Sequence, residues 1–145
     1  MATTTASLSL TSTDLFDDSL SISTINTLNK AGLTEGLDRT TGLNKTYLTA
    51  TTNVDIVTVP GATLDGKQNF VYIANLSKIA SEYLVVSIGD KVIGRLYAGD
   101  WMWTPWNQQA AHLSDIEIAP SVATGMWVEH MIIGEGLVMT SSADS

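Results

Sequence analysis

Three tryptophans close together form the most distinctive candidate site of the chain. Trp101, Trp103 and Trp106 fall within six consecutive positions. Polar residues flank them: Asp100, Asn107 and Gln108. If the segment is a strand, Trp101 and Trp103 share one face, because alternate side chains of a strand point the same way. Indole rings with polar neighbours suit a glycan platform, a subunit contact or a core, so the pattern predicts one of these three.

Residues that commonly carry catalysis or bind metals are sparse. The chain contains no cysteine and two histidines, His112 and His130, fewer than a histidine-based metal site needs. Glu129 and His130 are adjacent, so in a strand they point to opposite faces. No Gly-x-Ser-x-Gly segment marks a nucleophile. We therefore expect no catalytic residue, no metal, no cofactor and no enzymatic activity.

One segment nevertheless resembles part of a metal-binding motif. Residues 99–105 fit the Gly-x5-Pro portion of the second motif of the cupin family, whose jelly rolls bind a metal through three His and one Glu. The glycine and histidine that continue that motif would fall at Asn107 and Ala110, and the His-x-His of the first motif is absent. A degenerate cupin-like metal enzyme is therefore the third of three interpretations.

The elements that would position these residues read as short strands. Apolar and β-branched residues recur in segments separated by turn signals such as Pro60-Gly61 and Gly89-Asp90. The segments are 43–51, 54–59, 70–76, 83–88, 92–97, 101–103, 115–118 and 126–133. Residues 19–31, where the alternation slips at Ile25, favour a bulged strand over a short helix. This spacing predicts an all-β fold, an antiparallel sandwich or jelly-roll-like structure with little or no helix.

The organisation along the chain predicts one domain with an arm. Residues 1–13 are rich in Ala, Ser and Thr, and form either a flexible tail or an extended arm that adds to a neighbour's sheet. The arm residues that would make contact are Thr3, Thr4, Thr5, Leu8 and Leu10. Residues 14–140 form a single β-sandwich domain, with a Thr-rich third at 14–52 and a compact module at 53–140. Residues 141–145 are a flexible tail.

The charge distribution excludes one large class of partner. The net charge is −8, and all seven basic residues precede residue 96. Such a surface repels a phosphate backbone, so nucleic-acid binding is not expected. No apolar run approaches the ~20 residues of a membrane-spanning helix, so no membrane association is expected either.

Residues 68–135 resemble small bacteriophage virion proteins in the order of their features. These are an apolar strand ending in Asn75, a hairpin through Gly89-Asp90, a Leu-x-x-Gly-Asp turn at 96–100, an aromatic strand closing on Pro105-Trp106, and a late Val128-Glu129 strand. The resemblance implies a capsid decoration (cement) protein, in which the arm at residues 1–13 would grip the capsid. Such a protein is made in the host cytoplasm and sits on the outer surface of the virion capsid, where it binds the major capsid protein.

Two leading interpretations follow. The first is this non-enzymatic decoration protein, which stabilises the shell and self-associates, as a trimer rather than a dimer, because closed cyclic symmetry and many copies strengthen weak contacts. The alternative is a glycan-binding β-sandwich module of a virion tail or fibre, in which the tryptophans stack on sugars.

Overall fold

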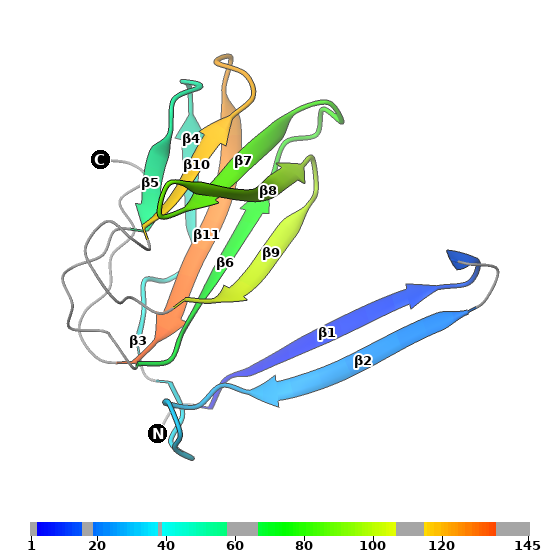
Figure 1. Ribbon diagram of the computed structural model, residues 1–145, viewed down its shortest axis with the longest axis vertical. Helices are drawn as coiled ribbons and strands as arrows, with labels where there is room; N and C mark the ends of the chain where they lie inside the picture. Colours follow the sequence, from blue (N-terminus) through cyan, green and yellow to red (C-terminus); the bar gives the residue numbers. More distant parts are fainter. Residues whose placement is uncertain (1–2, 16–18, 38, 58–66, 107–114, 136–145) are drawn as a thin grey trace.

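The chain folds as an antiparallel β-sandwich with a projecting two-stranded hairpin (Figure 1). The computed structural model describes residues 3–15, 19–37, 39–57, 67–106 and 115–135. Within these ranges there is no α-helix, and the strands are β1 (Thr5–Ser12), β2 (Leu20–Thr27), β3 (Arg39–Thr40), β4 (Asn44–Leu48), β5 (Val54–Val57), β6 (Asn69–Asn75), β7 (Tyr83–Ile88), β8 (Lys91–Tyr97), β9 (Trp101–Pro105), β10 (Ile116–Pro120) and β11 (Met126–Gly134). The predicted all-β antiparallel fold is confirmed.

Two sheets pack face to face to form the body of the molecule. One has the strand order β5-β10-β7-β8, and the other has β3-β11-β6-β9, with β4 also paired to β11. Burial alternates along β11, as expected for a strand with one face in the core. The core between the sheets is built from residues such as Ile73, Val128 and Ile132 on one side and Leu84, Val86 and Ile118 on the other.

Strand β6 occupies the centre of the larger sheet, between β11 and β9. It has apolar residues on both faces, and its burial is high along its whole length. The predicted turn at Gly89-Asp90 joins β7 to β8, with φ of 56° and 66° at the two residues. Positive φ at both central positions is the geometry of a tight hairpin whose twist matches the strands.

Strands β1 and β2 form a separate hairpin, here called the ribbon (residues 5–12 and 20–27). They pair with each other over eight consecutive residues, and their sheet contains no other strand of the described chain. The predicted bulge near Ile25 is wrong, because the pairing has no register shift. Ile25 instead lies on the opposite face from Leu20 and Ile22, where its side chain is 71% exposed.

Hydrogen bonds close the foot of the ribbon, and one of them connects the segment after it to the body. The amide of Leu28 donates to the carbonyl of Thr4 at 2.8 Å, and the amide of Leu37 donates to the carbonyl of Leu28 at 3.1 Å. The buried carboxylate of Glu135, which follows β11, accepts from the amide of Ala31 at 2.8 Å. The ribbon is therefore held at its foot and projects beyond the sandwich (Figure 1). The predicted tail at 141–145 lies outside the described residues.

Gly125 occupies a position that has no room for a side chain. Its φ is +118°, and a Cβ there would overlap the hydroxyl of Tyr47, which donates to the carbonyl of Thr124. We expect Gly125→Ala to lower the free energy of unfolding by about 1–3 kcal/mol, from backbone strain and the loss of this contact. Urea denaturation measures it. Gly42→Ala is the matched control, because Gly42 also has positive φ but has nothing within 4 Å of the added Cβ. Equal losses for both variants would contradict the overlap.

Glu117 lies on β10, close to carboxylates of neighbouring segments. Burial, then a hydrogen bond with Asp90 and the charges of Asp55, Asp90 and Asp115, raise its pKa. Because the folded pKa lies above the unfolded one, ionised Glu117 destabilises the fold at pH 7. That penalty shrinks as pH falls through the raised pKa, and it is absent below the ordinary value of 4.5.

Glu117→Gln should therefore raise the melting temperature at pH 7 by about 1–3 °C and leave it unchanged near pH 4. Thermal scans at both pH values check this. Glu129→Gln is the control, since Glu129 accepts a hydrogen bond from Tyr72 and lies opposite Lys45, so its neutralisation brings no gain. A gain for Glu117→Gln that persisted at pH 4 would refute the charge explanation.

Candidate interaction surface

The outward face of the five-stranded sheet carries Trp101 and Trp103, two of the predicted site residues. We call six large apolar side chains on this face of β6, β9 and the second half of β11 the wall; they are Phe70, Tyr72, Trp101, Trp103, Met131 and Ile133. Strand pairing places Tyr72 opposite Trp103 on one side and Met131 on the other. These three side chains therefore form one row across β9, β6 and β11. The alternation that sends Val71 and Ile73 into the core sends the wall residues outward.

Trp101 and Trp103 share the outward face, as their spacing predicted, but differ in surroundings. The ring of Trp103 stacks on Phe70 with centroids 5.1 Å apart and planes 9° from parallel. Trp101 lies opposite the small residue Ala74 and is 55% exposed. Trp101 is thus the tryptophan of the wall whose ring is open to solvent.

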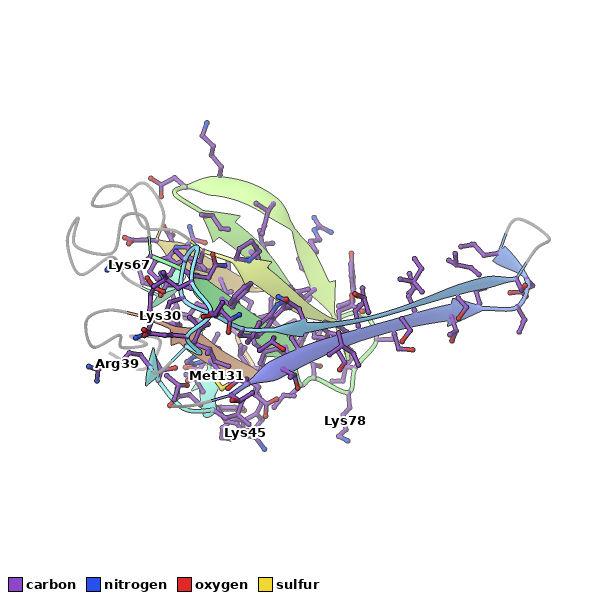
Figure 2. The ribbon with its side chains drawn as sticks, turned by 90° about the horizontal axis from the view of Figure 1, so that it is seen from below. Lys30, Arg39, Lys45, Lys67, Lys78 and Met131 are labelled. Atoms are coloured by element: carbon purple, nitrogen blue, oxygen red, sulfur yellow. The ribbon has the colours of Figure 1, made fainter. Side chains whose placement is uncertain are left out.

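A groove of about 840 Å³ lies between the wall and the foot of the ribbon. From the ribbon and the residue before it, Thr4, Thr5 and Leu8 line the groove; from the wall, Tyr72, Trp101 and Trp103 do. Figure 2 shows Met131, another lining residue, beside the foot of the ribbon. The structure therefore brings together two candidate sets that the sequence predicted separately. No Asp, Glu, Lys, Arg or His lines the groove within the described part of the chain.

The other predicted site residues lie elsewhere. Trp106 is 4% exposed and packs in the core, and its amide donates to the carbonyl of Asn69 at 2.9 Å. The carboxylate of Asp100 accepts from the amide of Tyr97 at 2.9 Å, so it stabilises the turn before β9. Thr3 is exposed before the ribbon, and Leu10 lies along the ribbon beyond the groove lining. Asn107 and Gln108 are outside the described residues.

Glu129 lies beside the wall and is hydrogen-bonded to one of its members, Tyr72. The hydroxyl of Tyr72 donates to Glu129 Oε1 at 3.1 Å. Burial is the main cause that raises the pKa of Tyr72, and this hydrogen bond and the charge of Glu129 raise it further. Lys45 on β4 lies opposite Glu129. The charged side chains of Glu129 and Lys45 therefore lie next to the wall, whose own side chains are uncharged.

His130 points inward and Glu129 points outward, so these adjacent residues lie on opposite faces, as the sequence predicted. It is buried, and its Nε2 lies 3.1 Å from Thr46 Oγ1. Among the described residues, no group of three or more His, Cys, Asp or Glu is arranged to hold a metal. His112 is outside the described ranges. The described residues contain no helix that is long and apolar enough to cross a membrane.

Sequence reasoning missed several groove residues, among them Tyr72, Met131, Ile133 and Asn26. Three of them carried a usable signal, since β6 and β11 have apolar residues at outward as well as inward positions. An open sheet with two apolar faces needs a cover on both. The approach of residues 4–28 to residues 72–133 had no local signal.

Comparison with known proteins provides no relative from which to transfer a function. No protein-family model, curated protein or solved structure matches the chain. The ribbon, the wall and the groove are therefore the features from which function is inferred.

Proposed function

We propose that this chain is a non-enzymatic viral structural protein. It acts as a decoration (cement) protein that binds the major capsid protein on the outer surface of a virion shell and self-associates there. The observation that carries the proposal is the ribbon, a hairpin that leaves the body and has one apolar face. A catalytic domain has no need of such a projection, whereas a protein that ties subunits together does.

The ribbon is amphipathic along its length. Its apolar face combines Ala6, Leu8 and Leu10 of β1 with Leu20 and Ile22 of β2, since Leu10 lies opposite Ile22 and Ser12 opposite Leu20. The other face carries Thr and Ser side chains, with Ile25 as its one large apolar residue in the paired segment.

This apolar face is open in the single chain. Leu8, Leu10 and Ile22 are 42%, 50% and 41% exposed. A lone two-stranded hairpin is marginally stable in water, and contiguous exposed apolar surface marks an interaction site. The ribbon therefore supports a role in binding another protein subunit.

The body supports the same role as a rigid platform. Its core cluster draws on both sheets and includes no residue of the ribbon, so the body can hold its shape while the ribbon engages a partner. Copies repeated over a symmetric shell would turn weak individual contacts into firm attachment.

Co-sedimentation with shells tests the proposal. The shells are assembled from the major capsid protein encoded in the same genome as this chain. We expect the full chain to pellet with them and a variant lacking residues 3–27 to stay in the supernatant. Circular dichroism of the variant checks that the body has folded. Equal pelleting of both proteins would refute the role of the ribbon, and no pelleting of the full chain would refute the decoration function.

A glycan-binding module of a tail or fibre is the second candidate function. The specific observation in its favour is the exposed ring of Trp101 in a groove that also contains the hydroxyl of Thr24 and the amide of Asn26. On this account Trp101→Ala abolishes binding on a glycan array. Trp127→Ala leaves it intact, because Trp127 is similarly exposed on β11 but does not line the groove. Absence of any glycan signal for the unmodified chain would remove this candidate.

A further inference from the structure

The chain carries two apolar surfaces that it does not cover itself. The groove lies between the wall and the foot of the ribbon, with Ala6, Leu8 and Thr24 among its lining residues. The outer half of the apolar face, with Leu10, Leu20 and Ile22, lies beyond the groove lining. Figure 1 shows this outer half projecting clear of the sandwich. Its own body therefore cannot cover it without a change in the direction of the ribbon.

We propose that the outer half of the ribbon of one copy docks into the groove of a second copy. Leu10 and Ile22 of the first copy then lie against Trp101 and Trp103 of the second. This inference rests on the proposed function, because it names the partner used in self-association. A single type of contact covers both open surfaces, whereas ribbon stacked on ribbon would leave the groove and Trp101 open.

The charge pattern favours a second copy as the occupant. Strands β1 and β2 contain no ionisable residue, and the groove lining contains no acidic or basic one. Two copies of a chain with net charge −8 repel each other across most of their surfaces. Contact between the uncharged ribbon and the uncharged groove lets them associate without opposing carboxylates.

Such a contact joins different surfaces on the two copies, so it closes into a ring when the rotation between copies allows it. A small closed ring suits repeated attachment to a symmetric shell. The polar face of each ribbon remains available to the capsid protein. We therefore expect a ring of three copies rather than a reciprocal pair.

Light scattering of the full chain without shells tests the contact, using one added carboxylate per variant. The unmodified chain is expected at a multiple of 15.5 kDa. Leu10→Glu, on the ribbon, and Trp101→Glu, in the groove, are each expected at the monomer mass. Ile25→Glu is the matched control, since it adds the same charge to the opposite face of the ribbon and should leave the assembly intact.

Mixing the two monomeric variants identifies the surfaces in contact. The ribbon of the Trp101→Glu variant and the groove of the Leu10→Glu variant are both unaltered, so an equimolar mixture should give a dimer. No dimer in the mixture would overturn the ribbon-to-groove contact, as would a monomeric unmodified chain or an assembly that survives Leu10→Glu. Because shells are absent, these outcomes are independent of whether the chain binds a capsid.

A cross-linking measurement covers the case in which a charged variant does not fold. The chain has no cysteine, so Leu10→Cys and Trp101→Cys chains can be mixed and oxidised without competing thiols. The account predicts a disulfide-linked dimer that contains one chain of each kind. Failure to form it, while Ile25→Cys with Trp101→Cys forms one, would contradict the proposed face of the ribbon.

Discussion

Replacing Trp106 with alanine is expected to lower the free energy of unfolding by about 3–5 kcal/mol, because it empties the space of a large ring in a packed core. Trp106 is 4% exposed and belongs to the cluster that joins the two sheets. Urea or thermal denaturation followed by circular dichroism measures the change. A loss of this size would unfold a marginally stable domain at moderate temperature.

Trp101→Ala is the matched control for Trp106. It removes the same side chain from the same segment, but from a position that is 55% exposed. We expect it to cost less than about 1 kcal/mol, as surface substitutions do. Similar losses for the two variants would mean that the wall is buried in the folded protein, contrary to its description as an open surface. The comparison separates the core tryptophan from the contact tryptophan.

Asn75→Ala is expected to cost about 2–4 kcal/mol, because it leaves several buried backbone groups without partners. The side-chain amide of Asn75 donates to the carbonyl of Leu96 at 2.9 Å, and its oxygen accepts from the amide of Ser77 at 2.9 Å. Its backbone also exchanges hydrogen bonds with Gly99 and Asp100. Asn75 thus holds the turn in which the chain passes from β8 in one sheet to β9 in the other.

Asn69→Ala provides the comparison at the other end of β6. Asn69 is equally buried, but its side-chain amide makes one long hydrogen bond, 3.4 Å to the carbonyl of Lys67, and its Oδ1 has no partner among the described residues. Denaturation midpoints should therefore move less for Asn69→Ala than for Asn75→Ala. The reverse order would contradict the role assigned to Asn75 in the crossover turn.

The strands of the body could be predicted from the sequence because their side chains follow simple local rules. Apolar residues repeat every second position in β11, and both faces of β6 are apolar. The Gly89-Asp90 turn joins two such segments. The Asn75 and Gly99-Asp100 features that marked the resemblance also have a structural meaning, since hydrogen bonds connect them.

The ribbon and the groove could be predicted only in part. Leu8 and Leu10 indicated an extended segment, but its partner strand β2 looked irregular because Ile25 falls on the polar face. Trp106 looked like a neighbour of Trp101 and Trp103, although it continues the alternation of Met102, which packs against the core. The groove itself depends on the foot of the ribbon, which the distant Glu135 helps to hold in place.

The ribbon and the wall together suggest how one small chain could reinforce a shell. Each body would present an uncharged groove, and each ribbon would reach out with an uncharged apolar face. Neighbouring copies would then be linked in a closed set, and the set would attach through many weak contacts. No bound cofactor is required for this role.

The thermal stability of shells with and without the protein tests the decoration function most directly. Shells of the major capsid protein are heated alone, with the full chain, and with the variant that lacks residues 3–27, and their disruption is followed by light scattering. Binding that favours the intact shell must raise its disruption temperature. We expect the disruption temperature to rise with the full chain and not with the variant. An unchanged or lowered disruption temperature with a saturating amount of the full chain would contradict the decoration function.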